Sequence, residues 1–312
     1  MPPKVSVCLV TYNHENYIRQ CLDAILSQQV TFDYEIVIGE DKSKDNTLAV
    51  VTEYQQKHPG KISIITSADN VGMVANWERT LMACKGKYIA IIEGDDCWIS
   101  NYKLQKQFDQ FEQHPEYALC FHNVEVEYGE GVIQENPLVA VTEDEELSVR
   151  DVILRNWFIP TCSMMIRRDA LSLFPEWTRG LQSIDIVVQL MVTMHGHIGY
   201  LSEKMGLYRI HGGGISQVQW LGNANRLQLS FIEIFKHFDE YSKWKYHEYV
   251  SQRLQRGYKA IMNLNPPKSS IYLKALFKTI ALNPRQNLSL LKDYLIVNLI
   301  PQRVYKIYKS LR

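Results

Sequence analysis

The sequence lacks several features that define large classes of protein. Its 34 Lys and Arg residues balance its 34 Asp and Glu residues, so the chain lacks the global basic field of a nucleic-acid-binding protein. No stretch approaches the roughly 18 apolar residues that a membrane-spanning helix needs. The apolar stretch at 5–10 is too short for the core of a signal peptide. We therefore expect a cytoplasmic protein that binds no nucleic acid.

Paired cysteine motifs are missing too. The six cysteines, at positions 8, 21, 84, 97, 120 and 162, form no C-x-x-C pair and no short repeating interval. This spacing speaks against a zinc ribbon and against a disulfide framework. Isolated cysteines in apolar stretches are usually buried thiols, which is typical of a reduced, intracellular protein.

The common glycine-rich phosphate-binding motifs are also absent. The sequence contains no G-x-G-x-x-G after its first predicted strand and no G-x-x-x-x-G-K-[ST]. A dinucleotide oxidoreductase and a P-loop NTPase therefore lose their main support. A nucleotide held mainly by carboxylates and a metal ion remains compatible with the sequence.

Short apolar runs alternate with helical patterns over the first hundred residues. The runs at 4–10, 34–39, 61–66 and 87–93 are rich in Val and Ile and bounded by polar turns, which is typical of buried parallel strands. Apolar residues recur every three or four positions over 17–26, so one face of a helix is apolar. This alternation predicts an α/β fold, with a mostly parallel sheet flanked by helices.

The pattern loosens after residue 94. We expect a helix over 103–114 and a strand over 117–122. The segment 125–146 has eight acidic residues and no basic one, which favours a solvated hairpin and loop over an acidic binding site. From residue 223 the pattern is almost wholly helical. We place a domain boundary near residue 220, with an α/β domain over 1–220 and a helical region over 221–312.

Polar residues follow each predicted strand of the sheet. Ligands of open parallel sheets bind outside the carboxyl ends of the strands. The residues at these positions are Thr11, Tyr12 and Asn13, then Glu40 and Asp41, then Asp69 and Asn70, and finally Glu93, Gly94, Asp95 and Asp96. Any one of them can instead cap the following helix. Together they predict that polar groups converge on one edge of the sheet.

Capping does not explain the last group well. Glu93, Asp95 and Asp96 place three carboxylates within four residues, and these repel one another unless a cation or an array of donors compensates them. Mg²⁺ or Mn²⁺, bridging carboxylates to substrate phosphates, is an economical solution. The sequence therefore predicts a divalent metal ion at this turn.

An ordered set of motifs resembles a known family, the inverting nucleotide-sugar glycosyltransferases of family 2, which have a GT-A fold. The resemblance covers about residues 4 to 216. It is carried by residues 5–13, 39–47, 70–73, 86–96, 98, 103–107, 159–163, 167–168, 185, 195–200 and 208–214. It implies a GT-A domain, with the helical C-terminal region as an appendage.

The resemblance implies a role for each matched residue. Thr11 and Asp41 would hold the nucleotide base, with Asp41 accepting from a uracil-type imide. Asp95 would face the ribose or the metal shell, and Asp96 would coordinate the metal ion on the diphosphate. Glu93 stands where many members have Asp, and Lys42 occupies a position often held by a small or polar residue.

The resemblance also implies roles for residues near the nucleotide, near the diphosphate or acceptor, and at the catalytic base. Tyr12, Asn13 and Asn70 would complete the nucleotide-binding set, and Arg209 and His211 would lie near the diphosphate or the acceptor. Asp185 falls at the position of the catalytic base, although a carboxylate before an apolar run can also be a helix N-cap. Trp157 fits either stacking on a sugar or aromatic packing, of which the second is commoner.

The resemblance thus implies a metal-dependent, inverting glycosyltransferase of the hexosyltransferase type. The donor would be of UDP type and the acceptor a hydroxyl of a glycan or a lipid-linked sugar, in surface polysaccharide synthesis. One alternative is a sugar nucleotidyltransferase, but 11–16 holds no Gly, Arg or Lys for the basic loop that such an enzyme needs. A second alternative is an inactive nucleotide-sugar-binding protein, against which the joint presence of Asp41, Asp96 and Asp185 argues.

The end of the chain is locally basic. Residues 285–312 hold six basic residues and one acidic residue, and a helix beginning after Pro301 would have an apolar stripe flanked by Arg303, Lys306 and Arg312. Such a helix fits either packing on the catalytic domain or peripheral attachment to an anionic membrane. We favour attachment to the cytoplasmic face, because an acceptor on a lipid carrier has to be met there.

Overall fold

The computed structural model describes residues 2–129, 131–135, 139, 141–181, 183–214 and 223–299. The chain forms two compact units, Met1–Gly214 and Ile215–Arg312. The predicted boundary near residue 220 falls within 215–222, outside the described residues.

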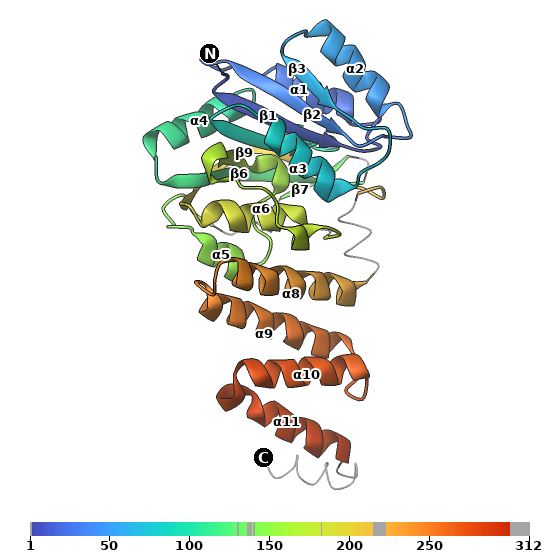
Figure 1. Cartoon of the computed structure of the whole chain (residues 1–312), viewed down its shortest axis with the longest axis vertical. Helices are drawn as coiled ribbons and strands as arrows, with labels where there is room; N and C mark the ends of the chain where they lie inside the picture. Colours follow the sequence, from blue (N-terminus) through green and yellow to red (C-terminus); the bar gives the residue numbers. More distant parts are fainter. Residues whose placement is uncertain are drawn as a thin grey trace. The chain divides into compact units, whose positions relative to one another are not determined.

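The first unit is built on one mixed sheet. Its strands, within the described residues, are β1 (Val5–Thr11), β2 (Tyr34–Glu40), β3 (Ile62–Ile65), β4 (Tyr88–Glu93), β5 (Cys97–Trp98), β6 (Tyr117–Tyr128), β7 (Val132–Glu135), β8 (Met165–Arg167) and β9 (His197–Ile210). Their order is β3-β2-β1-β4-β8-β6-β9-β5, and β7 pairs with β6 (Figure 1). The first four strands in this order are parallel, as predicted.

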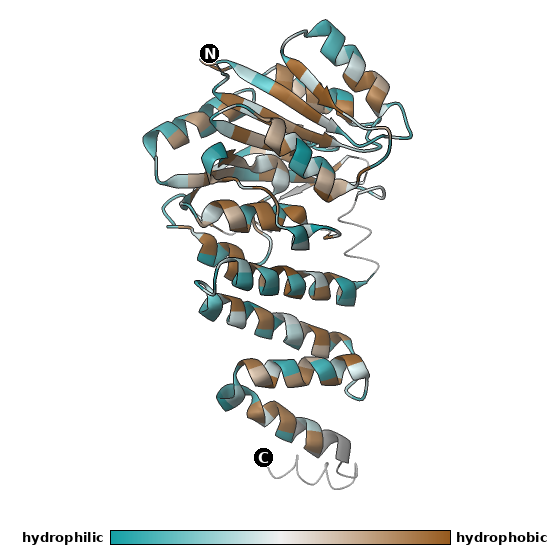
Figure 2. Ribbon diagram, in the orientation of Figure 1, coloured by the Kyte–Doolittle hydropathy of each residue, from teal (hydrophilic) through white to brown (hydrophobic). Residues whose placement is uncertain are grey.

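Helices flank this sheet, which confirms the predicted α/β fold (Figure 1). They are α1 (Ile18–Leu26), α2 (Thr47–Lys57), α3 (Met73–Ala83), α4 (Lys103–Gln113), α5 (Val149–Leu154) and α6 (Ile184–Thr193), with short 3₁₀ turns at Thr161–Ser163, Arg168–Ala170 and Glu176–Thr178. Every residue of β1 is buried, so the strand is apolar on both faces (Figure 2). This two-sided burial is why the first strands are continuous apolar runs in the sequence.

The second half of the sheet differs from the sequence expectation. β6 runs on to Tyr128 instead of ending at His122, and β9 lies in a stretch for which we predicted no strand. Ser202, Glu203 and Lys204 interrupt β9 with exposed or half-exposed polar side chains, which hides its apolar pattern. β9 pairs with β6 in parallel through two register irregularities near Asn123, so tertiary pairing defines this strand.

The second unit consists of helices in the described residues. α8 (Ala224–Tyr241), α9 (His247–Leu264), α10 (Ser270–Leu282) and α11 (Pro284–Leu299) each pack against the next along the chain. Within the described part of the chain, no helix is long and apolar enough to cross a membrane.

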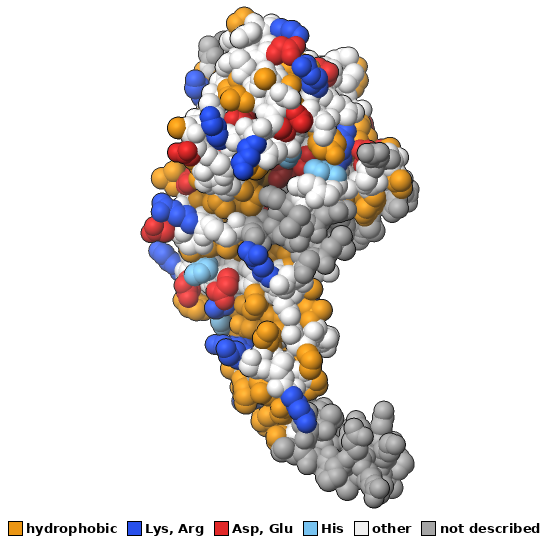
Figure 3. Space-filling model, turned by 90° about the vertical axis from the view of Figure 1, so that its right-hand side faces the viewer, with side chains coloured by type: hydrophobic (Ala, Val, Ile, Leu, Met, Phe, Trp, Pro, Cys, Tyr) orange, Lys and Arg blue, Asp and Glu red, His pale blue; other side chains and the backbone are white. Residues whose placement is uncertain are grey.

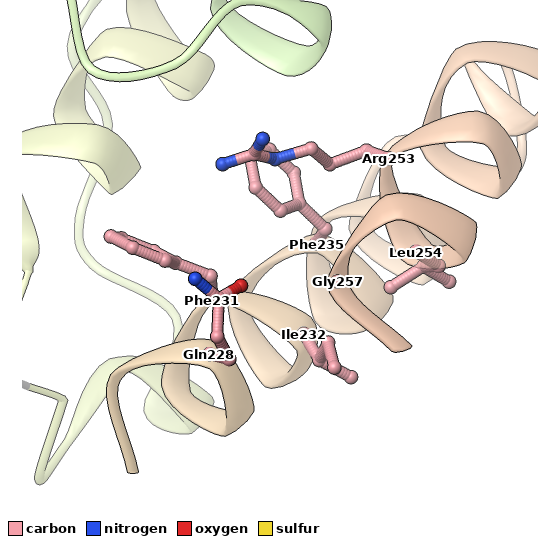
Figure 4. Close-up of a pocket in the computed structure, with 7 residues that line it drawn as sticks. All are labelled: Gln228, Phe231, Ile232, Phe235, Arg253, Leu254 and Gly257. Atoms are coloured by element: carbon pink, nitrogen blue, oxygen red, sulfur yellow. The ribbon is translucent and has the colours of Figure 1, made fainter. Parts of the chain in front are cut away.

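A small pocket lies between α8 and α9 (Figure 4). The Arg253 guanidinium lies over the Phe235 ring, 5.2 Å from its centroid. Gly257 permits the close approach of the two helices, because a Cβ there would lie 2.9 Å from Ile232 Cγ1. The pocket is lined by Gln228, Phe231, Ile232, Phe235, Arg253, Leu254 and Gly257. Its floor is therefore part of the core of this unit.

A lysine lies inside the core of the first unit. Lys103 is fully buried at the start of α4, with its Nζ 4.0 Å from the centroid of the Trp98 ring. Among the described residues, none accepts a hydrogen bond from this Nζ. Burial disfavours the charged amine and lowers the pKa of Lys103 to about 7.

This lowered pKa predicts a pH-dependent stability. The unfolded chain keeps Lys103 protonated up to about pH 10.4, whereas the folded chain releases the proton above about 7. Between these values the unfolded state binds more protons, so the Lys103 contribution to stability rises with pH. Near pH 6 the buried, charged amine destabilises the folded chain. Lys103→Met removes this amine, so the variant should be more stable than the wild type at pH 6. The difference should shrink towards pH 10 when stability is measured by urea unfolding.

The exposed Lys85 provides the control, because Lys85→Met removes a lysine that is exposed in the folded chain and keeps Lys103 in place. A difference between Lys103→Met and the wild type that stays constant from pH 6 to pH 10 would contradict the prediction.

Candidate functional site

The ends of three adjacent strands bring the predicted polar residues together. In the register of the sheet, Thr11 of β1 pairs with Glu40 of β2, and Val10 of β1 pairs with Glu93 of β4. The residues that follow these positions therefore lie at one edge of the sheet. On this unit, acidic and histidine side chains lie beside one another at the surface, in the upper part of Figure 3.

Asp41, directly after β2, fastens the loop at 70–72 to the sheet. Its Oδ1 accepts a hydrogen bond from Val71 N at 2.8 Å, and its Oδ2 accepts from Gly72 N at 3.0 Å and from Asn70 Nδ2 at 2.9 Å. The Arg79 guanidinium lies 3.6 Å from Oδ1. Asp41 and Asn70, predicted separately from the sequence, are thus partners in one contact.

The turn after Asp41 is held by a buried carboxylate. Glu40 is fully buried, and its side chain accepts hydrogen bonds from Lys42 N and Ser43 N at 3.1 and 2.7 Å. Lys42 adopts a left-handed conformation with φ of 59°, which is rare for residues other than glycine. The hydrogen bonds to Glu40 stabilise Lys42 in this conformation.

The residues after β1 face the same turn. Asn13 is also left-handed, with φ of 56°, and its Oδ1 accepts from Lys44 N at 2.8 Å. Thr11 is buried, and its Oγ1 lies 3.3 Å from His14 Nδ1. The Tyr12 side chain between them is half-buried. The first two strand ends therefore form one connected rim.

Gly94 lets the acidic turn after β4 reach this rim. A Cβ at this position would lie 2.6 Å from Thr11 Oγ1 and 3.0 Å from His14 Nδ1. The turn can approach β1 only because this residue has no side chain. Glu93, Asp95 and Asp96 then diverge from the glycine in different directions.

Asp95 faces two histidines. Its Oδ2 lies 3.1 Å from His211 Nε2 and 3.6 Å from His14 Nε2, and its side chain is 17% exposed. Burial by itself raises the pKa of Asp95, but the neighbouring His14 and His211 outweigh it, so the net pKa is lowered. Asp95 is therefore an ionised carboxylate with access to solvent.

Asp96 turns inward instead. Its Oδ1 accepts from the backbone N of Arg209 in β9 at 2.9 Å, and its side chain is almost completely buried. Its Oδ2 is buried with no hydrogen-bond partner among the described residues. Burial, followed by the charge of Asp95, raises the pKa of Asp96 well above its usual value.

Arg209 supports the acidic turn from behind. Its Nη1 donates to the backbone oxygen of Asp95 at 2.7 Å, its Nε to Glu127 at 2.8 Å, and its Nη2 to Gln20 at 2.5 Å. The guanidinium is buried, so these three acceptors engage each of its nitrogens. The structure places Arg209 beneath the turn and His211 at the partly exposed Asp95, where its ring lies 4.8 Å from the Tyr17 ring and is tilted by 42°.

Asp185 lies in the first turn of α6. Its Oδ2 accepts a hydrogen bond from Trp157 Nε1 at 2.8 Å. Burial raises the pKa of Asp185, whereas the indole N–H, followed by the backbone N–H groups of Ile186 and Asp185, opposes this rise by stabilising the charged form. The pKa of Glu93 is raised by burial and then by the charges of Asp95, Asp96 and Asp185, which shows that the acidic turn and Asp185 share one electrostatic environment.

The acidic turn fits a divalent cation, although no ready-made metal cage is present. Among the described residues, no group of three His, Cys, Asp or Glu side chains is arranged to hold a metal ion. The unpartnered Oδ2 of Asp96 and the raised pKa values of Glu93 and Asp96 mark uncompensated negative charge. Mg²⁺ is usually bound by one or two carboxylates together with substrate phosphates, and Asp95 supplies an accessible carboxylate of this kind.

Sequence reasoning missed several residues of this site. His14 follows the strand-end segment by one residue, and extending the inspection that far would have found it. Arg79 lies on a helix far along the chain from Asp41, and no local pattern links the two. The sequence suggests sugar stacking or aromatic packing for Trp157, but no local pattern links it to Asp185. Only the folded arrangement reveals these partners.

The chain is similar in sequence to glycosyltransferases and to uncharacterized proteins. Residues 6–174 match the family model described as glycosyl transferase family 2. The uncharacterized protein Rv1520 of Mycobacterium tuberculosis is 34% identical over 211 residues, which cover 68% of this chain and 60% of that protein. The putative teichuronic acid biosynthesis glycosyltransferase TuaG of Bacillus subtilis is 25% identical over 81% of this chain and 97% of its own length.

Solved structures share the fold at lower identity. The crystal structure of S. aureus TarS 1-349 in complex with UDP has a TM-score of 0.62 at 17% identity, and the match covers 91% of this chain and 82% of that chain. The mannosyltransferase PcManGT from Pyrobaculum calidifontis, in complex with GDP-Man and Mn²⁺, has a TM-score of 0.56 at 15% identity, covering 95% and 86% of the two chains.

Proposed function

Because the chain belongs to glycosyl transferase family 2, we propose that it transfers a sugar from a nucleoside diphosphate donor of UDP type to a hydroxyl group, with inversion at the anomeric carbon. The observation that carries this proposal is the shared environment of the acidic turn and Asp185. The accessible Asp95 for the donor and the half-buried Asp185 for the acceptor lie within electrostatic range of the same residue, Glu93.

The rim formed by the first two strand ends binds the nucleoside. Its polar contacts come from Thr11, Tyr12, Asn13, Asp41 and Asn70. Although Asp41 already accepts three hydrogen bonds, a carboxylate has about four lone-pair sites, so it retains capacity for the imide N–H of a uracil base.

The acidic turn binds the diphosphate. Asp95 and Asp96, with Glu93 beside them, would hold Mn²⁺ or Mg²⁺, and His211 lies next to Asp95. A divalent ion, when bound, neutralises the charge that develops on the departing nucleoside diphosphate. Arg209 orients the turn through its bond to the backbone oxygen of Asp95.

Asp185 acts as the general base. The acceptor hydroxyl loses its proton to this carboxylate as its oxygen attacks the anomeric carbon, and the bond from that carbon to the diphosphate breaks. The raised pKa of Asp185 makes it a stronger base than an ordinary aspartate. Attack from the face opposite the leaving group inverts the configuration.

We propose a glycan or a lipid-linked sugar as the acceptor, in the synthesis of a surface polysaccharide. The support is the likeness to TuaG, which is named as a putative teichuronic acid biosynthesis glycosyltransferase and which this chain matches over 97% of its length. Peripheral contact with the cytoplasmic face of a membrane accompanies such an acceptor. The basic helix predicted after Pro301 lies outside the described residues. The exposed side chains of α10 and α11 support the same proposal of membrane contact.

The outer faces of these two helices combine apolar and basic side chains. Phe277 is 58% exposed on α10 beside Lys274 and Lys278, and Leu288 is 59% exposed on α11 near Lys292. Such a surface suits the interface of an anionic membrane, where each basic residue contributes about 1 kcal/mol.

The first prediction from this function concerns donor and metal. UDP-glucose, UDP-N-acetylglucosamine or GDP-mannose should raise the melting temperature by about 5 °C at saturation with MnCl₂, and a chelator should abolish most of this shift. Asp95→Asn should lose the metal-dependent part, because it removes the accessible charge. The exposed Glu176 is the control, and Glu176→Gln should behave as the wild type. An undiminished shift in excess EDTA would sink the metal proposal.

The second prediction concerns the base. Asp185→Asn keeps the shape of the side chain but cannot accept the proton, so turnover should fall by about 10² to 10⁴-fold while donor binding stays intact. The product of an α-linked donor should be a β-glycoside by NMR coupling constants. Near-normal turnover in this variant would remove Asp185 from the mechanism, and an α-linked product would contradict inversion.

The third prediction concerns the membrane. The full chain should sediment with vesicles of phosphatidylcholine and phosphatidylglycerol at low salt, and much less with phosphatidylcholine alone or at 0.5 M salt. Deleting residues 302–312, or replacing Lys274 and Lys278 with Gln, should weaken sedimentation and leave donor binding unchanged. A wild-type chain that stays in the supernatant under all conditions would show that the membrane proposal is wrong.

A further inference from the structure

The residue that contacts the proposed base lies on a segment without regular secondary structure. Trp157 lies between α5 and the 3₁₀ turn at Thr161–Ser163, 28 residues before Asp185 in the sequence. Its indole N–H donates to Asp185 Oδ2 at 2.8 Å. An interaction with an ionised acceptor is about twice as strong as one between neutral groups, so this bond favours one orientation of the carboxylate.

Two further contacts fix the indole and the segment that carries it. Its ring packs on Tyr208 of β9, with the centroids 5.4 Å apart and the planes tilted by 48°. One turn further along α6, Gln189 Nε2 donates to the backbone oxygen of Ile159 at 3.3 Å. The segment that carries Trp157 is thus tied to the same helix at two points and to the sheet at a third, which restricts the motion of the indole.

The contact divides the two oxygens of Asp185 between two tasks. Oδ2 is engaged by the indole, and a general base needs a free oxygen aimed at the hydroxyl from which it takes the proton. We propose that Trp157 is a positioning residue for the glycosyl transfer: by holding Oδ2 of Asp185, it presents Oδ1 to the acceptor hydroxyl. This inference rests on the proposed role of Asp185 as the base and adds Trp157 as the residue that orients it.

Trp157 therefore acts on the acceptor step and not on donor binding. The contacts of the donor side run through Asp41 and Asp95, and within the described residues neither side chain hydrogen-bonds to the indole. Loss of the indole N–H should consequently lower kcat and leave donor affinity unchanged.

The first test reads the contact directly, without turnover. The six tryptophans give up to six indole ¹H–¹⁵N resonances in the intact chain, and Trp157→Phe identifies one of them by its loss. In Asp185→Asn that resonance should move, because a neutral amide is a weaker acceptor than a carboxylate. A resonance that stays in place would overturn the proposal, since the indole would then not donate to Asp185 in solution.

The second test uses kinetics. Trp157→Phe keeps an aromatic ring against Tyr208 but removes the donor, and it should lower the kcat of donor hydrolysis by about tenfold or more with unchanged donor KM. The donor is whichever of UDP-glucose, UDP-N-acetylglucosamine and GDP-mannose stabilises the wild type. Trp177→Phe makes the same chemical change elsewhere in the first unit and should retain the wild-type kcat.

The double variant separates the two proposals. In an Asp185→Asn background, Trp157→Phe should cause no further loss of kcat, because Trp157 acts through that carboxylate. Full additivity of the two losses would overturn the positioning role alone. Wild-type turnover in the single Asp185→Asn variant would instead overturn the assignment of the base. A Trp157→Phe variant with reduced donor affinity and unchanged kcat would show that the indole belongs to the donor side.

Discussion

Repulsion among three carboxyl groups in four residues is the constraint that the first unit has to satisfy. The structure separates the groups by direction: Asp95 points to two histidines, and Asp96 points to a backbone N–H of β9. Arg209 then joins the turn to β6 and α1 through Glu127 and Gln20. The acidic turn depends on the contacts that β9 makes with it. The long pairing of β6 with β9 is therefore needed for the geometry of the site as well as for the sheet.

The sequence predicts the parts of this arrangement that depend on local pattern. β1 and β4 are recognisable because strands buried on both faces are unbroken apolar runs, and the carboxylates after them mark the ligand edge. β9 escapes prediction because its polar middle breaks the run and its pairing with β6 is irregular. The inward turn of Asp96 and the partner of Asp185 depend on contacts far apart in the chain, and no spacing rule encodes them.

The two sides of the site are built differently. The proposed donor side consists of strand ends held together by hydrogen bonds to backbone N–H groups, as where Glu40 holds the turn at Lys42. The proposed acceptor side consists of one helix and a neighbouring irregular segment, joined by side chains such as Trp157 and Gln189. Irregular segments tolerate sequence change better than paired strands do, so variation among relatives should concentrate on the acceptor side.

The contact between Asp41 and the loop at 70–72 has a further consequence. Two successive backbone N–H groups, of Val71 and Gly72, lie at the start of α3, where nucleotide-binding folds with glycine-rich loops offer such groups to phosphate. In this chain an internal carboxylate already occupies them. The helix dipole at this end is consequently satisfied from within the protein, and these two N–H groups are not available to a phosphate.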